Sequence, residues 1–569
     1  MKNNKLQKKL KQYIQFEKNN FFKDEAIKLL KENNKTEIYN RFHKELEFGT
    51  AGMRGIIGAG SCYINTYNIA KASQGIANYI LTITQNPKIA ISYDSRHFSK
   101  EFAYEAAEIF ASNGIKVYIY KNLRATPQLS YTVRKLNCDL GIMITASHNT
   151  KEYNGYKVYW KGGAQIIDPH DAKIISAIQK VSNIKHTFIK REGINKRIII
   201  ELKNEIDIKY IQKINDEFPN FNQKSKTTNL RIAYTPLHGT GGTIIKKLFK
   251  GSKVELLTEQ TQINPDPEFP TVKYPNPEEH TTMSRVIELA KKTNCDIAFA
   301  TDPDADRLGI AFKESRKWKI LNGNQIACIL MHYLLSRENN PKNTFIIASF
   351  VTTPMLDKIA QKYNTTLYRT YTGFKWIGNL IDKIQKKEPN KKFIFGCEES
   401  HGYLIGTGTR DKDAFSAIKG FCDLMFTLKK NQITINQYLQ TMYKEFGYYE
   451  DFTINKIFKE TNGDFLREKL MLQFRNNITK EFAGLFIIKK LDYKTLKEID
   501  MHGNVYTIKG YTHTTNAIKF LLENKIEITI RPSGTEAKIK FYISIYSRYE
   551  QKNSIFDIMN KIKMEIEKY

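Results

Sequence analysis

Short apolar runs alternate with amphipathic stretches along most of the chain. Three times, the order is apolar run, helical stretch, apolar run, helical stretch, apolar run. The runs lie at residues 89–93, 115–120 and 139–145, at 230–234, 254–257 and 296–300, and at 345–350, 367–370 and 392–395. Short runs of this kind are typical of buried strands, and strands that alternate with helices are typical of parallel sheets. The pattern therefore predicts three related α/β domains.

The two ends of the chain depart from this pattern. Residues 1–45 have helical spacing with a charged surface, which predicts a helical extension. Residues 526–530 and 539–545 alternate strictly between apolar and polar, which predicts antiparallel strands, and a terminal helix is expected after Ile555. We expect an α/β protein of three related domains with mixed, largely parallel sheets (1–205, 206–318 and 319–440), followed by an α+β domain (441–569).

Each repeat ends in a polar loop directly after its last strand, the edge at which open α/β sheets bind ligands. In the first repeat this loop contains Ser147, with His148 beside it and Lys157 nearby. A serine in this position is a candidate nucleophile that carries a group covalently. A polar loop without function is the alternative for this motif taken alone. Upstream, the glycine-rich residues 47–55 include Arg54, whose fork of donors suits a phosphate.

The second repeat ends in three alternating carboxylates, Asp302, Asp304 and Asp306. Carboxylates this close repel one another unless a cation neutralises them, and oxygen-only ligands suit Mg²⁺ or Mn²⁺. An EF-hand would need glycine and glutamate where Arg307 and Lys313 stand. A metal-dependent phosphatase with an aspartyl nucleophile also places Asp-x-Asp after a strand. The fifth position of its motif, counted from the first Asp, is usually Thr or Val, whereas here it is Asp306. A solvated acidic turn is the remaining alternative.

A phosphate cradle is predicted between the last two strands. Arg531, Ser533, Gly534 and Thr535 combine a guanidinium, two hydroxyls and backbone amides at a glycine turn. The chain contains no GxxxxGK[ST] motif, which argues against an ATP-driven kinase.

The third repeat ends in Glu398 and Ser400, whose oxygens suit sugar hydroxyls. The four loops together therefore favour phosphoryl transfer by positioning and electrostatics. A phosphorylated Ser147 would carry about −1.5 to −2 charge, which a metal ion and Arg54 or Arg307 would offset.

The formal net charge of +30 changes this picture little, because lysine is spread along all 569 residues together with abundant Asn and Ile. Such a spread favours compositional drift over a nucleic-acid site, although a non-enzymatic role in binding nucleic acid stays open as an alternative. Six scattered cysteines without a CxxC pair predict reduced thiols in a cytoplasmic protein. No apolar run approaches the roughly 18 residues of a membrane span, and no secretory signal is expected.

Four stretches in this order resemble the α-D-phosphohexomutase family: TASHN, DPDADR, EES and RPSGT at residues 145–149, 302–307, 398–400 and 531–535. Residues 48–55 and 372–378 are most similar to its phosphoglucomutase/phosphomannomutase branch, which includes members active as phosphopentomutases. The resemblance implies a last domain like the TATA-binding protein, with all four domains around a central cleft.

The resemblance also implies an activity. A phosphorylated Ser147 would convert hexose 1-phosphate to hexose 6-phosphate through a bisphosphorylated sugar that turns around in the cleft. Glucose is the first expected sugar and mannose the second, with phosphopentomutase activity as the alternative. One Mg²⁺ per chain would be held by the phosphoserine with Asp302, Asp304 and Asp306, and glucose 1,6-bisphosphate would be the activator. Partners would be sugar phosphates, not nucleic acid or membrane, and the protein would be a monomer or homodimer.

The remaining roles are carried over residue by residue. Lys157 and Lys412 would exchange protons, while His148 would position the serine. A histidine that some members use has no counterpart here, since His401 stands one place early and Gly402 holds the matching place. The resemblance gives the substrate-binding residues as Arg307, Thr372, Gly373, Lys375, Glu398, Ser400, Arg531, Ser533, Gly534 and Thr535.

Overall fold

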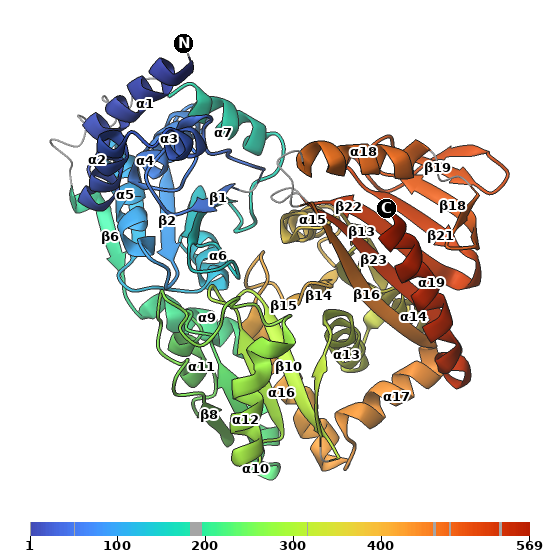
Figure 1. The fold of residues 1–569 in the computed structure, drawn as a ribbon. Helices are drawn as coiled ribbons and strands as arrows, with labels where there is room; N and C mark the ends of the chain where they lie inside the picture. The colour runs from blue at the N-terminus through green and yellow to red at the C-terminus, as the bar shows by residue number, and fades with distance from the viewer. Residues whose placement is uncertain are drawn as a thin grey trace. The chain divides into compact units, whose positions relative to one another are not determined.

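The computed structural model of the chain describes residues 2–50, 52–181, 196–315, 317–458, 463–476, 480–533 and 538–569. Contacts within the chain divide it into two compact units, whose helices and strands are labelled in Figure 1. Unit 1 comprises Met1–Ile326, Asn343–Ile347 and Gly373–Gln432, and unit 2 comprises Ala327–Lys342, Ala348–Thr372 and Ile433–Tyr569.

The first sheet of unit 1 has the strand order β1-β5-β4-β2-β3-β6. Strands β4, β2, β3 and β6 are parallel, whereas β5 and β1 run antiparallel at one side. The strands are β1 (Gly52–Ile56), β2 (Lys88–Tyr93), β3 (Lys116–Tyr120), β4 (Leu140–Ile144), β5 (Tyr153–Trp160) and β6 (Ile199–Leu202). The helices before and between them are α1 (Lys2–Phe16), α2 (Asn20–Glu32), α3 (Lys35–Phe42), α4 (Thr66–Ile80), α5 (Ser99–Ser112), α6 (Thr126–Lys135) and α7 (His170–Gln179).

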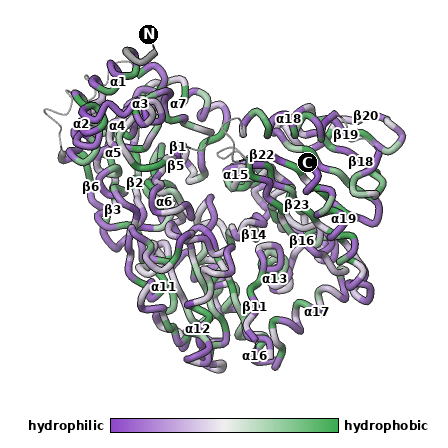
Figure 2. Tube along the Cα trace, in the orientation of Figure 1, coloured by the Kyte–Doolittle hydropathy of each residue, from purple (hydrophilic) through white to green (hydrophobic). Residues whose placement is uncertain are grey.

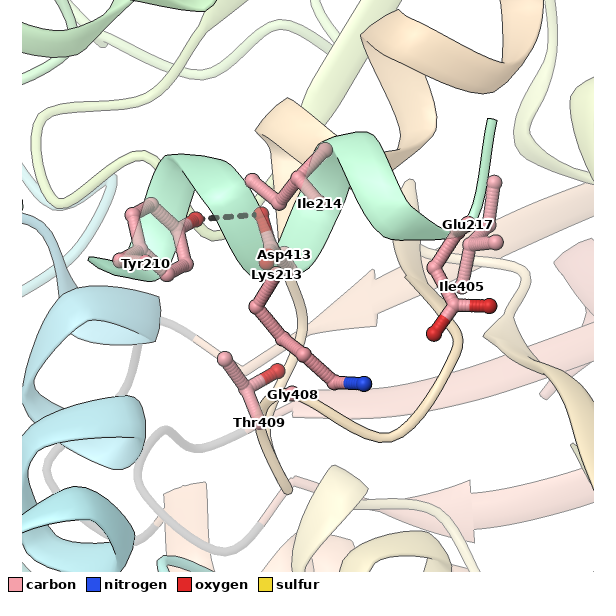
Figure 3. A pocket seen from close by; sticks show the side chains of 8 residues that line it. All are labelled: Tyr210, Lys213, Ile214, Glu217, Ile405, Gly408, Thr409 and Asp413. Atoms are coloured by element: carbon pink, nitrogen blue, oxygen red, sulfur yellow. Dashed lines mark hydrogen bonds between the residues drawn. The ribbon is translucent and has the colours of Figure 1, made fainter. Parts of the chain in front are cut away.

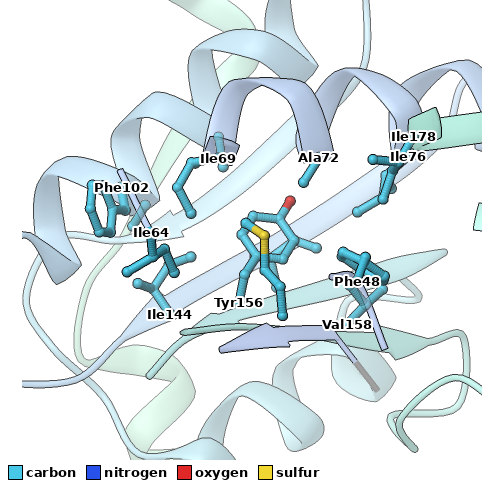
Figure 4. Packing of buried hydrophobic residues seen from close by; sticks show 14 of the residues in the cluster. Phe48, Ile64, Ile69, Ala72, Ile76, Phe102, Ile144, Tyr156, Val158 and Ile178 are labelled. Atoms are coloured by element: carbon cyan, nitrogen blue, oxygen red, sulfur yellow. The ribbon is translucent and has the colours of Figure 1, made fainter. Parts of the chain in front are cut away.

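Alternate residues of the strands build two apolar layers, because successive side chains of a strand point to opposite faces. Ile142 and Ile144 of β4 face α4, α5 and α7, whereas Met143 faces α6. Figure 4 shows the first layer, in which Tyr156 and Val158 of β5 face the α4 residues Ile69, Ala72 and Ile76. Both faces of the central strands are covered, so their sequences read as continuous apolar runs.

The second sheet of unit 1 has the order β11-β10-β9-β7-β8. Here β8, β7 and β9 are parallel, and β10 and β11 are antiparallel. Its strands are β7 (Leu230–Thr235), β8 (Val254–Thr258), β9 (Ile297–Thr301), β10 (Leu308–Glu314) and β11 (Lys317–Leu321). The helical segments around them are α9 (Glu205–Asp216), α10 (Phe221–Thr227), α11 (Gly242–Leu248), η2 (His280–Met283) and α12 (Ser284–Lys292), whereas η1 (Lys196–Ile198) directly precedes β6 of the first sheet.

The third sheet has the order β13-β12-β14-β15, in which β14 and β15 form an antiparallel hairpin. Its strands are β12 (Thr344–Ser349), β13 (Thr366–Thr370), β14 (Lys392–Glu398) and β15 (Gly402–Ile405). The helical segments of this part are α13 (Gly323–Ser336), η3 (Pro341–Asn343), α14 (Met355–Tyr363), α15 (Phe374–Lys387) and α16 (Ala414–Lys430). Asp413 caps the N-terminus of α16, and its carboxylate accepts hydrogen bonds from the amides of Phe415 and Ser416.

Unit 2 contains the C-terminal sheet, in the order β16-β23-β22-β21-β18-β19-β20, with β17 paired to β18. The strands are β16 (Tyr448–Ile457), β17 (Glu481–Phe482), β18 (Leu485–Asp492), β19 (Lys497–Asp500), β20 (Val505–Thr507), β21 (Ile518–Leu522), β22 (Ile526–Pro532) and β23 (Lys538–Ser547). The helical segments are α17 (Ile435–Phe446), α18 (Gly463–Asn476), η4 (Glu523–Lys525), η5 (Tyr549–Ser554) and α19 (Ile555–Lys568). Alternate residues of β22 and β23 pack against α18 and α19, as the strict alternation predicts.

The predicted α/β class is confirmed: three α/β/α domains with mixed, largely parallel sheets precede a sheet-rich C-terminal part. The sequence pattern missed the antiparallel strands β5, β10 and β15, which return directly after the three polar loops. Each of these loops is therefore the turn of a hairpin. Hydrophilic residues are distributed over the whole trace rather than gathered in one segment (Figure 2). Within the described ranges, no helix combines the length and the apolarity that crossing a membrane requires.

Candidate active site

The turn between β4 and β5 carries Ser147, whose side chain is buried. Its φ of +54° lies in the left-handed region, which a residue with a Cβ adopts only when its surroundings impose it. The Ser147 amide donates to Thr145 Oγ1 at 2.8 Å, and Ser147 Oγ donates to Asp302 Oδ2 at 2.8 Å. The predicted nucleophile of the first repeat therefore touches the acidic loop of the second.

The turn between β9 and β10 holds Asp302, Asp304 and Asp306 at 0%, 0% and 1% exposure. One carboxylate oxygen from each lies within 4.8 Å of the others. Asp302 Oδ1 accepts the amides of Asp306 and Arg307, both at 3.0 Å, which fixes the turn. Burial, followed by the neighbouring charges of Asp304 and Asp306, raises the pKa of Asp302 well above its ordinary value.

These carboxylates fit a divalent cation. Among the described residues, Asp304 Oδ1 and Asp306 Oδ1 are buried without a hydrogen-bond partner. A buried unpaired carboxylate oxygen is costly, and three hard oxygen donors at this spacing suit Mg²⁺. The donor set therefore agrees with the metal site that the sequence predicts.

Two lysines from separate elements approach the same carboxylates. Lys157 of β5 places Nζ 2.7 Å from Asp304 Oδ2 and 3.4 Å from Asp306 Oδ2. Lys412 places Nζ 3.0 Å from Asp306 Oδ2 and 3.2 Å from Asp411 Oδ1. Burial works against both charges, but the carboxylates outweigh it and raise the pKa of each lysine, so both are cations.

The same ion pairs act on Asp304 in the opposite direction. Burial alone would raise its pKa, but Lys157 outweighs burial and holds the pKa of Asp304 below its ordinary value. Asp302, with no lysine within salt-bridge distance in the described structure, is shifted upward instead. The three carboxylates are therefore inequivalent, and Asp302 is the one that accepts the Ser147 hydroxyl.

Gly402, the first residue of β15, explains where Lys412 lies. A Cβ built on Gly402 would lie 2.2 Å from Lys412 Cδ and 2.8 Å from its Cγ. The stem of Lys412 therefore occupies the space that any side chain at 402 would need. The neighbouring His401 is buried, with Nδ1 3.0 Å from the backbone oxygen of Leu308. The histidine thus packs against the backbone, and the cation over this loop comes from Lys412.

The predicted arginines also lie at the site. Arg54 of β1 donates at 2.8 Å to Asn149 Oδ1, within the serine loop (residues 145–150) that carries Ser147. Arg307 is paired with Glu278, and despite burial the carboxylates around it raise its pKa. His148 lies 3.3 Å from Ser147 Oγ through Nδ1. Burial, followed by the charges of Arg307 and Arg54, lowers the pKa of His148 well below its ordinary value, so its ring is neutral.

The sugar loop, residues 398–402, joins this cluster through Glu398. Glu398 is 6% exposed, and its Oε1 accepts the amide of Gly373 at 2.6 Å. Burial raises the pKa of Glu398, while Lys412 and Arg307 act in the opposite direction. Ser400 is half-buried in the same turn, and Lys375 lies in the first turn of α15 with its pKa lowered by burial.

Some of the predicted residues belong to unit 2 rather than to unit 1, among them Thr372, Arg531 and Ser533. Arg531 is half-buried on β22 opposite Lys540, and the Ser533 amide donates to the backbone oxygen of Lys538 at 2.8 Å. The predicted residues Gly534 and Thr535 lie outside the described residues.

Sequence reasoning missed Asp94, Arg96, Glu278 and Asp411. Asp411 accepts the Tyr159 hydroxyl at 2.8 Å, and this bond holds the carboxylate that pairs with Lys412. A signal existed only for Asp94 and Arg96: they follow β2, which neighbours β4 in the sheet, so their loop lies beside the serine loop. Glu278 and Asp411 occur in segments without such a pattern.

A small cavity elsewhere in unit 1 is not this site. It has a volume of about 10 Å³ and is lined by residues of α9 and of the segment that follows β15, including Tyr210 and Asp413 (Figure 3). That volume holds about one water molecule, and the Tyr210 hydroxyl donates to Asp413 Oδ1 at 2.8 Å across it. It has no room for a sugar phosphate.

Comparison with known proteins agrees with this geometry. Family models described as phosphoglucomutase/phosphomannomutase α/β/α domains I, II and III match residues 45–185, 208–315 and 322–446. A phosphoglucomutase from Staphylococcus haemolyticus is 35% identical over 552 residues, covering 95% of this chain and 98% of that protein. A phosphoglucomutase from Staphylococcus aureus (strain MRSA252) is 34% identical, covering 89% of this chain and 90% of that protein.

Solved structures share the fold at lower sequence identity. A putative phosphomannomutase from Thermus thermophilus superimposes with a TM-score of 0.68 at 19% identity, covering 92% of this chain and 99% of that one. The phosphoglucomutase pp63/parafusin from Paramecium gives 0.64 at 18% identity, covering 88% of this chain and 90% of that one.

Proposed function

The chain belongs to the α-D-phosphohexomutase family, in its phosphoglucomutase/phosphomannomutase branch, and we propose that it interconverts glucose 1-phosphate and glucose 6-phosphate through phosphorylated Ser147. Family members are mutases, so the chain is an enzyme of the isomerase class. The observation that carries the proposed mechanism is the 2.8 Å contact from Ser147 Oγ to Asp302 within the buried carboxylate group.

The residues around Ser147 support a phosphoryl carrier. Asp302, Asp304 and Asp306 would hold one Mg²⁺ ion together with the phosphorylated serine, and the ion would supply Lewis-acid stabilisation of phosphoryl charge. Arg54 and Arg307 add fixed positive charge beside the turn. These groups favour the phosphorylated serine without proton transfer of their own.

Proton exchange falls to the two lysines. When the phosphoryl group moves from Ser147 to a sugar hydroxyl, the hydroxyl loses a proton and Ser147 Oγ gains one. Lys157 and Lys412 lie at the carboxylates on two sides. As a cation, either lysine can donate a proton to Ser147 Oγ, and the proton lost by the sugar hydroxyl then reprotonates the amine that this donation leaves. His148 is neutral and 3.3 Å from Ser147, which suits a positioning role.

Glu398 and Ser400 would bind sugar hydroxyls, with Gly373, Lys375 and Thr372 beside them. Arg531, Ser533, Gly534 and Thr535 would bind the phosphate that is not reacting. A glucose bisphosphate formed midway would present its second phosphate to the dephosphorylated Ser147, and added glucose 1,6-bisphosphate would phosphorylate an unmodified chain. The names of relatives 34–35% identical over most of the chain favour glucose over mannose, and over ribose or deoxyribose phosphates.

The test is a coupled assay with glucose 1-phosphate, Mg²⁺ and a trace of glucose 1,6-bisphosphate. We expect turnover by the wild type and a loss of at least about 1000-fold in Ser147→Ala, because the covalent carrier is gone. Equal turnover by both proteins would refute the mechanism. Peptide mapping would place phosphate on Ser147, whereas phosphate on Asp302 would indicate a phosphatase. A higher kcat/KM for mannose or ribose 1-phosphate would overturn the sugar assignment.

A further inference from the structure

One buried arginine holds the loop that carries Ser147. Arg96 follows β2, the strand next to β4, and its side chain has 0% exposure. Its guanidinium donates to four backbone oxygens: Nη2 to Ser147 at 2.6 Å and Asn149 at 2.5 Å, and Nη1 to Thr150 at 2.7 Å and to Tyr153, the first residue of β5, at 3.0 Å. A single planar group thus sets the direction of four peptide planes.

The guanidinium is itself fixed on two sides. Asp94 Oδ2 lies 3.2 Å from Arg96 Nε and also accepts the Thr145 hydroxyl at 2.6 Å. Because Thr145 Oγ1 accepts the Ser147 amide, this ion pair reaches both the amide and the carbonyl of the serine. The ring of Phe269, on a loop of the second α/β region, lies 5.1 Å from the Arg96 guanidinium carbon.

The loop that carries Phe269 also binds the first α/β region through exposed side chains. Glu268, next to Phe269, lies 2.6 Å from His97 Nε2 and 2.7 Å from Lys151 Nζ. His97 adjoins Arg96, and Lys151 lies in the turn that carries the serine. Arg96 and the turn that carries the serine therefore both contact this loop of the second α/β region. The bonds that Ser147 Oγ itself makes within the described structure go to Asp302 and His148.

The contacts of Arg96 matter because of the backbone that they support. The left-handed conformation of Ser147 (φ +54°) is unfavourable for a residue with a Cβ, so it persists only when surrounding bonds impose it. In this conformation Ser147 Oγ reaches Asp302 at 2.8 Å. Arg96 bonds the carbonyl of Ser147 rather than that hydroxyl, so its action on the hydroxyl runs through the backbone.

We propose that Arg96 is a positioning residue for phosphoryl transfer, which holds the Ser147 backbone left-handed and thereby directs its hydroxyl at Asp302. The turnover measurements below rest on the proposed mutase function. A lysine cannot replace Arg96 in this role, because its single ammonium cannot donate to four oxygens spread around a planar fork.

The experiment compares Arg96→Ala, Arg96→Lys and the control Arg41→Ala. Arg41 is also a largely buried arginine of unit 1 that bonds carboxylates and a backbone oxygen, but its partners are Glu25, Glu37 and Ala59. For both Arg96 variants we expect kcat to fall about 100-fold, the cost typical of a misplaced reacting group, with KM changed less than about threefold. Millimolar guanidinium should restore part of the kcat of Arg96→Ala and should not affect Arg41→Ala.

Normal kcat in Arg96→Lys, or a rise in KM with unchanged kcat, would overturn the proposal. If Arg96→Ala does not fold, Arg96→Lys and its hydrogen exchange still decide the question. Exchange at residues 145–150, measured without substrate, should be at least about tenfold faster in Arg96→Lys than in wild type. Unchanged exchange would refute the holding role. Faster exchange in Arg96→Lys, together with a wild-type protein that turns over no sugar phosphate, would instead show that only the proposed function had failed.

Discussion

The serine loop (residues 145–150) and the sugar loop (residues 398–402) have the same local plan but are held differently. Both connect a strand to an antiparallel return strand, and both contain a non-glycine residue in the left-handed region, Ser147 at φ +54° and His401 at φ +62°. The serine loop is held by one charged side chain, Arg96, that donates to its backbone.

The sugar loop is held by backbone contacts instead. The Leu308 amide donates to the His401 oxygen at 3.0 Å, and Arg307 and Gly402 form an isolated antiparallel bridge. These backbone contacts shape the edge of the loop without the side chains of Glu398 and Ser400. Because the side chains of Glu398 and Ser400 leave this backbone frame unchanged, we expect substitutions of them to raise KM. Substitutions of the groups around Ser147 should instead lower kcat.

The largest effect should follow removal of the metal. Asp304 and Asp306 each have a buried oxygen without a partner in the described structure, and a divalent ion is the group that this donor set suits. We expect EDTA to lower kcat at least about 1000-fold, comparable to or above the loss of one oxyanion donor, and excess Mg²⁺ to restore it. Full activity in EDTA, with the fold intact by circular dichroism, would contradict the assignment.

Gly402→Ala should lower kcat although Gly402 belongs to the sugar loop, so it departs from the division between the two loops. The new Cβ would lie 2.2 Å from Lys412 Cδ and would displace the lysine from Asp306. We expect kcat to fall about 100-fold while KM changes little, the lower end of what loss of a proton-transfer group costs.

Gly408→Ala is the matched control for that change. Its Cβ would meet the stem of another lysine, Lys213, at 3.0 Å, away from the carboxylates. We expect normal kcat for this variant. Equal losses in Gly402→Ala and Gly408→Ala would show that crowding of the backbone, rather than displacement of Lys412, lowers activity.

Glu398→Gln should raise KM, as expected for a sugar-loop side chain, with an effect smaller than that of Gly402→Ala. Glutamine keeps an oxygen to accept the Gly373 amide, which Glu398 accepts at 2.6 Å, but loses the charge. A hydrogen bond to a charged group contributes about 1.5 kcal/mol, so we expect KM for glucose 1-phosphate to rise about tenfold and kcat to fall less than about threefold. The control is Glu388→Gln. The Glu388 carboxylate pairs with Lys391 at 2.9 Å, and its loss should leave both constants unchanged.

Ser400→Ala should have the smallest effect of the series. The loss of one neutral hydrogen bond of about 1 kcal/mol predicts a rise in KM of about fivefold at an unchanged kcat. The control is Ser252→Ala, since Ser252 donates to the backbone oxygen of Phe249 in a surface turn. A large fall in kcat for Ser400→Ala would place Ser400 among the chemical groups and break the distinction between the two loops.

Much of the fold could be predicted because it follows from local periodicity. The apolar runs before Ser147, before Asp302 and before Glu398 are β4, β9 and β14, whose bounds lie close to the expected ones. The return strands β5, β10 and β15 were missed because none shows a strict alternation: β5 mixes buried and half-buried positions irregularly, β10 is buried over its first five residues and β15 over all four. The segment 431–525 was unreadable for a related reason: its strands are short or partly exposed.

The sequence alone predicts the fold class and the order of the polar loops, because hydrophobic spacing and turn residues specify strands, helices and turns within a few positions of the chain. Only the tertiary structure shows which residues of these separate loops contact one another. Ser147 binds Asp302, Lys412 fills the space next to Gly402, and Arg96 donates to the backbone oxygen of Ser147. These contacts join residues from 10 to 155 positions apart, and they depend on which strands lie side by side and on what space each side chain leaves to the next.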